Sequence, residues 1–357
     1  MRNYLRDHRY ELAVRAARAY PESTAVEGTP LLSTPQWLPH APIPLHDIKL
    51  QYTQAEEFGG ITGAESFIQR LLPTRSDGTK YPTYSDTVAA LAAPAIFENR
   101  STYRLLRANL HSNPYMVFSG GHYFDGINVG DAVAHEFTAA ILGELSTQDL
   151  RAVIGDPCDP ARRLVNVAVS TLTLRCDRTA GTVTFPLQRR DSARVGHAGG
   201  MYQVLPVGVF QPAGEKPWNI ENDFSLWRCI IRELAEELRG DTEDYDTHRG
   251  PIDYDAWPFA HQLTRALDTA QVRAFCVGMG VDPLTFATDI LTVVTIDAAL
   301  YDELFGQLAD INTEGSIIPA VSFNAQNLER YATTEPMQAA GAGLLRLAWQ
   351  HRSTLFT

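Results

Sequence analysis

Alternating apolar and polar residues mark the clearest strands of this chain. Residues 170–177 (STLTLRCD) and 182–188 (TVTFPLQ) alternate in this way on either side of Gly181, which predicts a β-hairpin. Residues 202–212 (YQVLPVGVFQP) form a nearly continuous apolar run, which is typical of a buried strand. Further strands are expected at 102–109, 115–118, 272–277 and 289–296.

Apolar residues at helical spacing predict a helix from 222 to 239, with Asn222 or Asp223 as its N-cap and Gly240 just beyond its end. Residues 130–142 show the same periodicity. Further helices are expected at 8–19, 65–72, 86–93, 255–270, 298–309, 324–331 and 336–351. Because strands and helices alternate along the chain, the sequence predicts an α/β or mixed α+β fold.

Prolines set the N-terminal segment apart. The prolines between residues 21 and 47 exclude regular structure there, yet residues such as Leu31 and Trp37 are too apolar for a free linker. We therefore expect an extended arm that wraps around the body of the protein. The predicted organisation is an N-terminal helix and Pro-rich arm at 1–47, an α/β domain at 48–164 and a second domain at 165–357.

Composition and charge exclude several classes of protein. The 357 residues are 45% hydrophobic and carry a net charge of −12 without a Lys/Arg-rich block, so we expect no nucleic-acid binding by this chain alone. No apolar run reaches the length of a membrane span, and the charged N-terminus does not resemble a signal peptide. The four cysteines are far apart and form no C-x-x-C pair, which favours a cytoplasmic protein.

The segment RELAEEL carries the strongest chemical signal. On a helix, Glu233, Glu236 and Glu237 stand at positions i, i+3 and i+4, so their carboxylates project from one face. Like charges at this spacing repel each other. They therefore either point into bulk water or share a cation, and Mg²⁺ commonly binds between carboxylates and substrate phosphates. Both readings remain open from spacing alone.

The same segment resembles the core of the Nudix box, G-x5-E-x7-R-E-U-x-E-E-x-G-U, where U is aliphatic. The core is matched by Arg232, Glu233, Leu234, Glu236 and Glu237. The upstream glutamate of the box falls on Phe224 and its first glycine on Trp218, and the glycine after the glutamates comes one residue late, at Gly240. The chain therefore keeps the metal-binding half of the pattern and departs from the upstream half.

A wider resemblance covers almost the whole chain. From about Val26 onward it is similar to the large Nudix-like region of actinobacterial proteins labelled transcriptional regulators. The stretches that carry the similarity include DGTKYPTYSDTVAAL, HAGGMYQVLPVGVFQP, DFSLWRCIIRELAEEL and EPMQAAGAGLLRLAWQHR. The 25 residues before Val26 are too few for the helix-turn-helix that many such proteins have. The resemblance implies a Nudix-like α/β/α sandwich at 165–357 with an additional N-terminal domain.

The resemblance also implies a function. It implies binding of a nucleoside-diphosphate-type or other diphosphate-containing small molecule with Mg²⁺ or Mn²⁺, and leaves open whether the ligand is hydrolysed. Glu236 and Glu237 would hold the metal, Glu233 would be a further ligand or general base, and Arg232 would orient the carboxylates. Such a metal polarises a phosphoryl oxygen and lowers the pKa of an attacking water. The alternatives are a non-catalytic ligand sensor and a Nudix fold reused in a biosynthetic pathway.

Four residues outside the box are candidates for ligand binding. Trp218, Tyr254 and Trp257 lie in segments that flank the box helix, where aromatic rings either stack on a flat ligand or pack in the core. Glu314, in the loop INTEGS, is a candidate for a distal metal ligand. The sequence does not determine the oligomeric state, and a homodimer is compatible with it.

Overall fold

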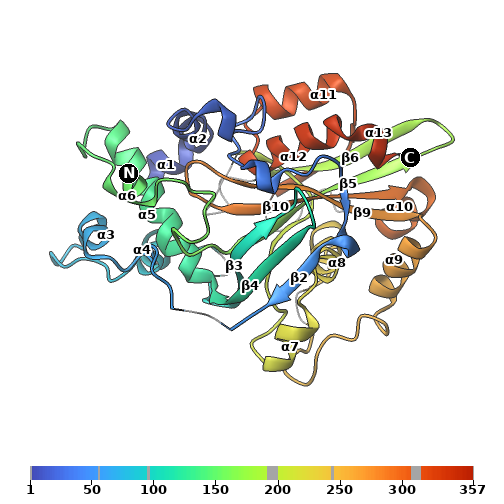
Figure 1. Ribbon diagram of the computed structural model, residues 1–357, viewed down its shortest axis with the longest axis horizontal. Helices are drawn as coiled ribbons and strands as arrows, with labels where there is room; N and C mark the ends of the chain where they lie inside the picture. Colours follow the sequence, from blue (N-terminus) through green and yellow to red (C-terminus); the bar gives the residue numbers. More distant parts are fainter. Residues whose placement is uncertain are drawn as a thin grey trace.

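The chain folds as a mixed α/β protein with two β-sheets, as predicted (Figure 1). The computed structural model describes residues 2–54, 57–94, 97–190, 200–242, 245–306 and 315–356. Within these ranges, no helix combines the length and apolar character that crossing a membrane requires.

The larger sheet has the strand order β1-β9-β10-β5-β6-β11, and two short strands, β7 and β8, pair with β6 and β5. Strands β10 and β5 are parallel, and the other pairs in this sheet are antiparallel. The predicted hairpin is confirmed as β5 and β6, with Gly181 at a φ of 64° in the turn. The bounds are β1 (Ile43–Pro44), β5 (Val167–Asp177), β6 (Thr182–Arg190), β7 (Tyr202–Val204), β8 (Val207–Val209), β9 (Val272–Val281), β10 (Thr288–Asp297) and β11 (Gly315–Ser322).

The run 202–212 is two strands rather than the single strand predicted. Strand β7 pairs with β6 through Val204 and Leu187, whereas β8 pairs with β5 through Val209 and Ala168. Pro206 lies between them and has no N–H to donate to a ladder, so the strand pairing is interrupted there. The break brings β8 next to the helix that carries RELAEEL.

Helices cover both faces of the larger sheet. On β10, Ile290, Val294 and Ile296 pack with α8, α9 and α10, whereas Leu291 and Val293 face α12 on the opposite side. Figure 1 shows α11–α13 on one side of the sheet and α8 and α9 on the other, which makes an α/β/α sandwich. The helices are α8 (Leu226–Leu234), α9 (Pro258–Asp268), α10 (Ala298–Phe305), α11 (Ala325–Glu329), α12 (Ala339–Gln350) and α13 (Arg352–Leu355), and a π-helical turn follows α11 at Arg330–Thr334.

The smaller sheet has the order β2-β4-β3, with β2 parallel and β3 antiparallel to β4. Its apolar side chains join the core beneath the larger sheet, where the rings of Phe118 and Phe210 lie 5.3 Å apart. Backbone hydrogen bonds from Tyr103 to Phe210 and from Leu105 to Val165 join the two sheets directly. The elements are β2 (Lys49–Tyr52), α3 (Ser66–Leu71), α4 (Tyr84–Ala92), β3 (Ser101–Asn109), β4 (Tyr115–His122), α5 (Tyr123–Ile141) and α6 (Asp149–Ile154).

The N-terminal segment begins with α1 (Arg2–Asp7) and α2 (Arg9–Ala17) and continues as an extended arm. Leu32 exchanges two backbone hydrogen bonds with Val281 of β9, and Ile43 pairs with Cys276 of the same strand. The side chain of Trp37 is buried. The arm therefore lies along the outer edge of the larger sheet and protects the hydrogen-bonding groups of β9 from solvent. Its short 3₁₀ turns are Glu22–Thr24, Pro35–Trp37 and Leu45–Asp47.

Candidate functional site

The helix that carries the glutamates begins later than predicted. A separate helix, α7 (Pro217–Asn222), ends first, and the hydroxyl of Ser225 then accepts the N–H of Arg228 and caps α8. A π-helical turn (Ala235–Arg239) extends α8 and ends at Gly240, whose φ of 75° is left-handed. The prediction of one helix from 222 to 239 was therefore wrong at its start, whereas Gly240 does mark the end.

The glutamates lie at the margin of the buried face of this helix. Ile230, Ile231 and Leu234 are fully buried, while Glu233, Glu236 and Glu237 remain partly accessible to solvent. We refer to the three glutamates together as the carboxylate triplet. Their common side of the helix is thus the boundary between the core and solvent, and they do not project freely into bulk water.

Two members of the triplet lie against strand β8. A Cβ atom added to Gly208 would come within 1.9 Å of the carboxyl carbon of Glu233, so the Glu233 carboxylate occupies the space above this glycine. Glu237 accepts the backbone N–H of Val207 through Oε1 at 3.1 Å. The positions of both carboxylates are therefore set by contacts with β8, whose residues precede them by 25 to 30 positions in the sequence.

Glu236 contacts a different part of the chain. Its Oε1 accepts the hydroxyl of Tyr245 at 2.8 Å. Burial and the neighbouring Glu236 carboxylate raise the pKa of Tyr245 well above its usual range, so the phenol stays protonated and acts as the donor. Glu236 is thus the member of the triplet that faces the segment after the helix.

The triplet is not a preformed metal centre. Among the residues that the structure describes, no three His, Cys, Asp or Glu side chains are grouped so that they could hold one ion. Carboxylate oxygens are the ligand type that Mg²⁺ prefers, but those of Glu236 and Glu237 already accept hydrogen bonds from the protein. These hydrogen bonds engage only the Oε1 atom of each carboxylate.

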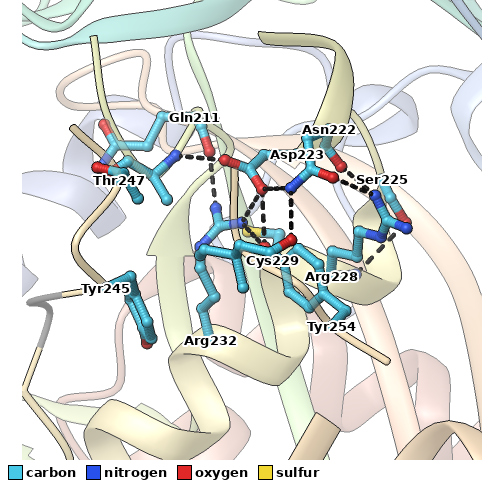
Figure 2. Close-up of polar contacts among 12 residues, drawn as sticks. Gln211, Asn222, Asp223, Ser225, Arg228, Cys229, Arg232, Tyr245, Thr247 and Tyr254 are labelled. Carbon is cyan, nitrogen blue, oxygen red and sulfur yellow. Dashed lines mark hydrogen bonds and ion pairs between the residues drawn. The ribbon is translucent and has the colours of Figure 1, made fainter. Parts of the chain in front are cut away.

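Arg232 is the centre of a buried polar network (Figure 2). Its Nη1 donates to the hydroxyl of Tyr254 at 2.7 Å, and its Nη2 donates to the carbonyl of Gln211 at 2.7 Å. Asp223, which has no exposed surface, lies 3.6 Å from the guanidinium. Asp223 in turn accepts the Tyr254 hydroxyl and the backbone N–H of Ala213, each at 2.8 Å.

This network keeps a buried charge in place. Burial alone lowers the pKa of Arg232, but its neighbours, Tyr254 and Asp223 among them, raise it overall, so the guanidinium is charged. Its hydrogen bonds join α8 to the segments before and after it. None of them reaches the carboxylate triplet, so the role expected for Arg232, orienting the glutamates, is not what these contacts do.

An open cavity of about 500 Å³ lies just beyond the C-terminal end of the carboxylate helix. The residues that line it include Tyr245 and Trp257, whose ring centroids are 5.4 Å apart, and Asp241 and Asp253. Because Tyr245 also donates to Glu236, one side chain connects the cavity wall to the triplet. The sequence indicated Trp257 but missed Tyr245, which a search for aromatic residues just after the box helix would have found.

The other candidate residues lie elsewhere. Tyr254 is only 6% exposed and its hydroxyl is bound to Asp223, so its ring is part of the core and is not offered to a ligand. Trp218 is 42% exposed on α7, where its indole N–H donates to the carbonyl of Thr247. It does not line the cavity. Glu314 falls outside the described residues.

Comparison with protein-family models and with curated proteins gives no match for this chain. Fold and site together define a mixed α/β protein in which a carboxylate-bearing helix, anchored by a buried arginine, ends beside an aromatic and acidic cavity.

Proposed function

We propose that this chain is a Nudix-like protein that binds a diphosphate-containing small molecule at the end of the carboxylate helix. The supporting observation is the contact between Tyr245 and Glu236, because it connects the cavity to the residues that the Nudix pattern selects. In this proposal a flat group of the ligand packs against the aromatic wall that Tyr245 and Trp257 form together, and the phosphates face the carboxylate triplet.

The charge around the cavity restricts how such a ligand binds. Asp241 and Asp253 line the cavity and Glu236 lies beside it, so a bare diphosphate anion would be repelled. Mg²⁺ is usually bound by one or two carboxylates together with substrate phosphates and water, without a complete cage of protein ligands. The proposal is therefore that Mg²⁺ or Mn²⁺ enters together with the diphosphate, whose charge it neutralises.

A non-catalytic ligand sensor is the second candidate. The observation that favours it is that two members of the triplet, Glu236 and Glu237, hold the hydroxyl of Tyr245 and the N–H of Val207. A carboxylate engaged in this way stabilises the fold and is a poorer general base or metal ligand. Ligand binding that displaces Tyr245 from Glu236 would change the loop after the helix, and that change is the output of a sensor. With its charge of −12, the chain in either role is proposed to bind no nucleic acid by itself.

The test combines thermal shift with phosphate release. Wild type is incubated with a panel of nucleoside-diphosphate compounds and Mg²⁺ or Mn²⁺, beside Trp257→Leu and the matched control Trp218→Leu, which removes an exposed ring outside the cavity. A ligand that raises the Tm of wild type and control, but not of Trp257→Leu, supports binding at this cavity. Turnover identifies an enzyme, and a shift without turnover a sensor. If no compound shifts the wild type, the proposal is wrong.

A further inference from the structure

Two histidines that are distant in sequence face each other on the surface. His40 belongs to the Pro-rich arm and His111 to the turn between β3 and β4. Their Nε2 atoms are 3.1 Å apart, and the ring centroids are separated by 4.2 Å at an interplanar angle of 58°. Both residues are exposed, so the pair lies at the solvent-accessible surface.

Both imidazoles are carried by backbone that is fixed from several directions. The side chain of Asn109 accepts the N–H of His111 at 2.9 Å, and the N–H of Leu110 donates to Gln36 of the arm at 2.7 Å. Three residues beyond His40, the arm pairs with β9. The two rings therefore meet because their segments are anchored, and a third group can bind between them without rearranging the backbone.

The separation of the two nitrogens suits a transition metal. With a Zn–N bond of about 2.0–2.1 Å, nitrogens 3.1 Å apart would subtend an angle of about 100° at the ion, close to the tetrahedral value. Imidazole is a preferred ligand of Zn²⁺, Ni²⁺ and Cu²⁺, whereas Mg²⁺ prefers oxygen. Without metal, one ring donates its Nε2 proton to the other. When metal binds, that proton moves to Nδ1 of the same ring, so both Nε2 lone pairs face the ion and no net proton is lost.

We propose that His40 and His111 form a two-imidazole binding site for a divalent transition metal of the zinc, nickel and copper group. The protein supplies two ligands and water fills the remaining positions, so the ion is exchangeable. Because one ligand comes from the arm and the other from the turn between β3 and β4, a bound ion links the arm to the smaller sheet. The site is independent of the carboxylate triplet and of the function proposed for it.

The experiment uses tag-free protein and Zn²⁺ alone, with calorimetric titration and thermal unfolding as the two measurements. Wild type is expected to bind one ion at this site and to gain in Tm, because the metal binds the native state only. His40→Gln and His111→Gln each remove one of two ligands, so each should weaken binding at least about tenfold and abolish the Tm gain. The double variant should lose no more than either single variant, because both ligands hold the same ion.

His46→Gln is the matched control, since His46 lies in the same arm with an 83% exposed side chain and should leave binding unchanged. All the substituted side chains are exposed, and the Tm without metal verifies that each variant is folded. Absence of Zn²⁺ binding by wild type overturns the proposal. So does a folded His40→Gln or His111→Gln variant that binds Zn²⁺ as wild type does.

Discussion

Replacing Asp223 by asparagine tests whether the buried network of Arg232 holds the carboxylate helix in place. The substitution keeps the size of the side chain but removes its charge and one of its two acceptor oxygens. In the wild type one oxygen accepts the hydroxyl of Tyr254, and the other accepts the N–H of Ala213. Asparagine can satisfy only one of these donors, and it leaves the guanidinium of Arg232 without its carboxylate partner.

The size of the effect follows from burial. Removing one partner of a buried ion pair costs about 3–5 kcal/mol. Arg232 keeps its hydrogen bonds to Tyr254 and Gln211, and its distance of 3.6 Å from Asp223 is longer than a direct hydrogen bond. The lower end of that range therefore applies, and we expect a loss of about 3 kcal/mol in the free energy of unfolding. For a chain of 357 residues, that is a fall in Tm of about 4 °C.

The assay is reversible denaturation of wild type, Asp223→Asn, Arg232→Met and the double variant. Removing both charges leaves no uncompensated ion. The loss of stability in the double variant should therefore be about 2 kcal/mol smaller than the sum of the two single losses. Asp255→Asn is the control, because this carboxylate is exposed and its removal should change stability by less than about 0.5 kcal/mol. A loss below about 1 kcal/mol in Asp223→Asn, or strictly additive single losses, would mean that the pair of Asp223 and Arg232 does not stabilise the fold as a buried ion pair.

Three further predictions concern other parts of the molecule. Gly208→Ala should displace the Glu233 carboxylate, because the added methyl group would overlap it. Since that carboxylate is the far end of a flexible, partly exposed side chain, the free energy of unfolding should fall by less than about 1 kcal/mol, and Glu233→Ala should remove this loss in a denaturation assay. Burial raises the pKa of Asp289 to about 7, so this carboxyl group holds its proton more tightly in the folded protein than in the unfolded chain. The free energy of unfolding should therefore fall between pH 4 and pH 7, by up to about 4 kcal/mol. Asp289→Asn should remove this pH dependence and keep the hydroxyl of Ser170 as a hydrogen-bond partner. All four cysteines are buried, and burial raises the pKa of each thiol, to about 12 for Cys158. A thiol reagent should therefore label none of them in the native protein and all of them after denaturation. Labelling of the native protein would contradict this prediction.

Local patterns in the sequence predicted most individual elements. The alternation on either side of Gly181 predicted the hairpin of β5 and β6, and helical spacing predicted α3 and α4 within about two residues at each end. These signals are local because a side-chain period of two or of 3.6 residues is written into consecutive positions. The mixed α/β class followed from their order along the chain.

The misplaced boundaries lie where a side chain has a more distant or less obvious partner. Helix α5 begins at Tyr123, seven residues before the predicted start, because His122 and Asp125 form a capping box. Asp223 looked like a helix cap, but it is buried with Arg232, and Ser225 caps α8 instead. The apolar run 202–212 predicted one strand, but the pairing is interrupted at Pro206, so that β7 pairs with β6 and β8 pairs with β5.

The features of the candidate site also fall into those that local sequence patterns predict and those that depend on contacts between distant segments. Sequence spacing is enough to predict that Glu233, Glu236 and Glu237 share one side of a helix, because positions i, i+3 and i+4 coincide on any helix. Their contacts with strand β8 and Tyr245, the buried ion pair of Arg232 and the cavity beside Glu236 all depend on the packing of distant segments. Those contacts join segments far apart in the chain. They exist because the sheet and the core bring these segments together. A pattern confined to neighbouring residues carries no information about which distant segments come into contact.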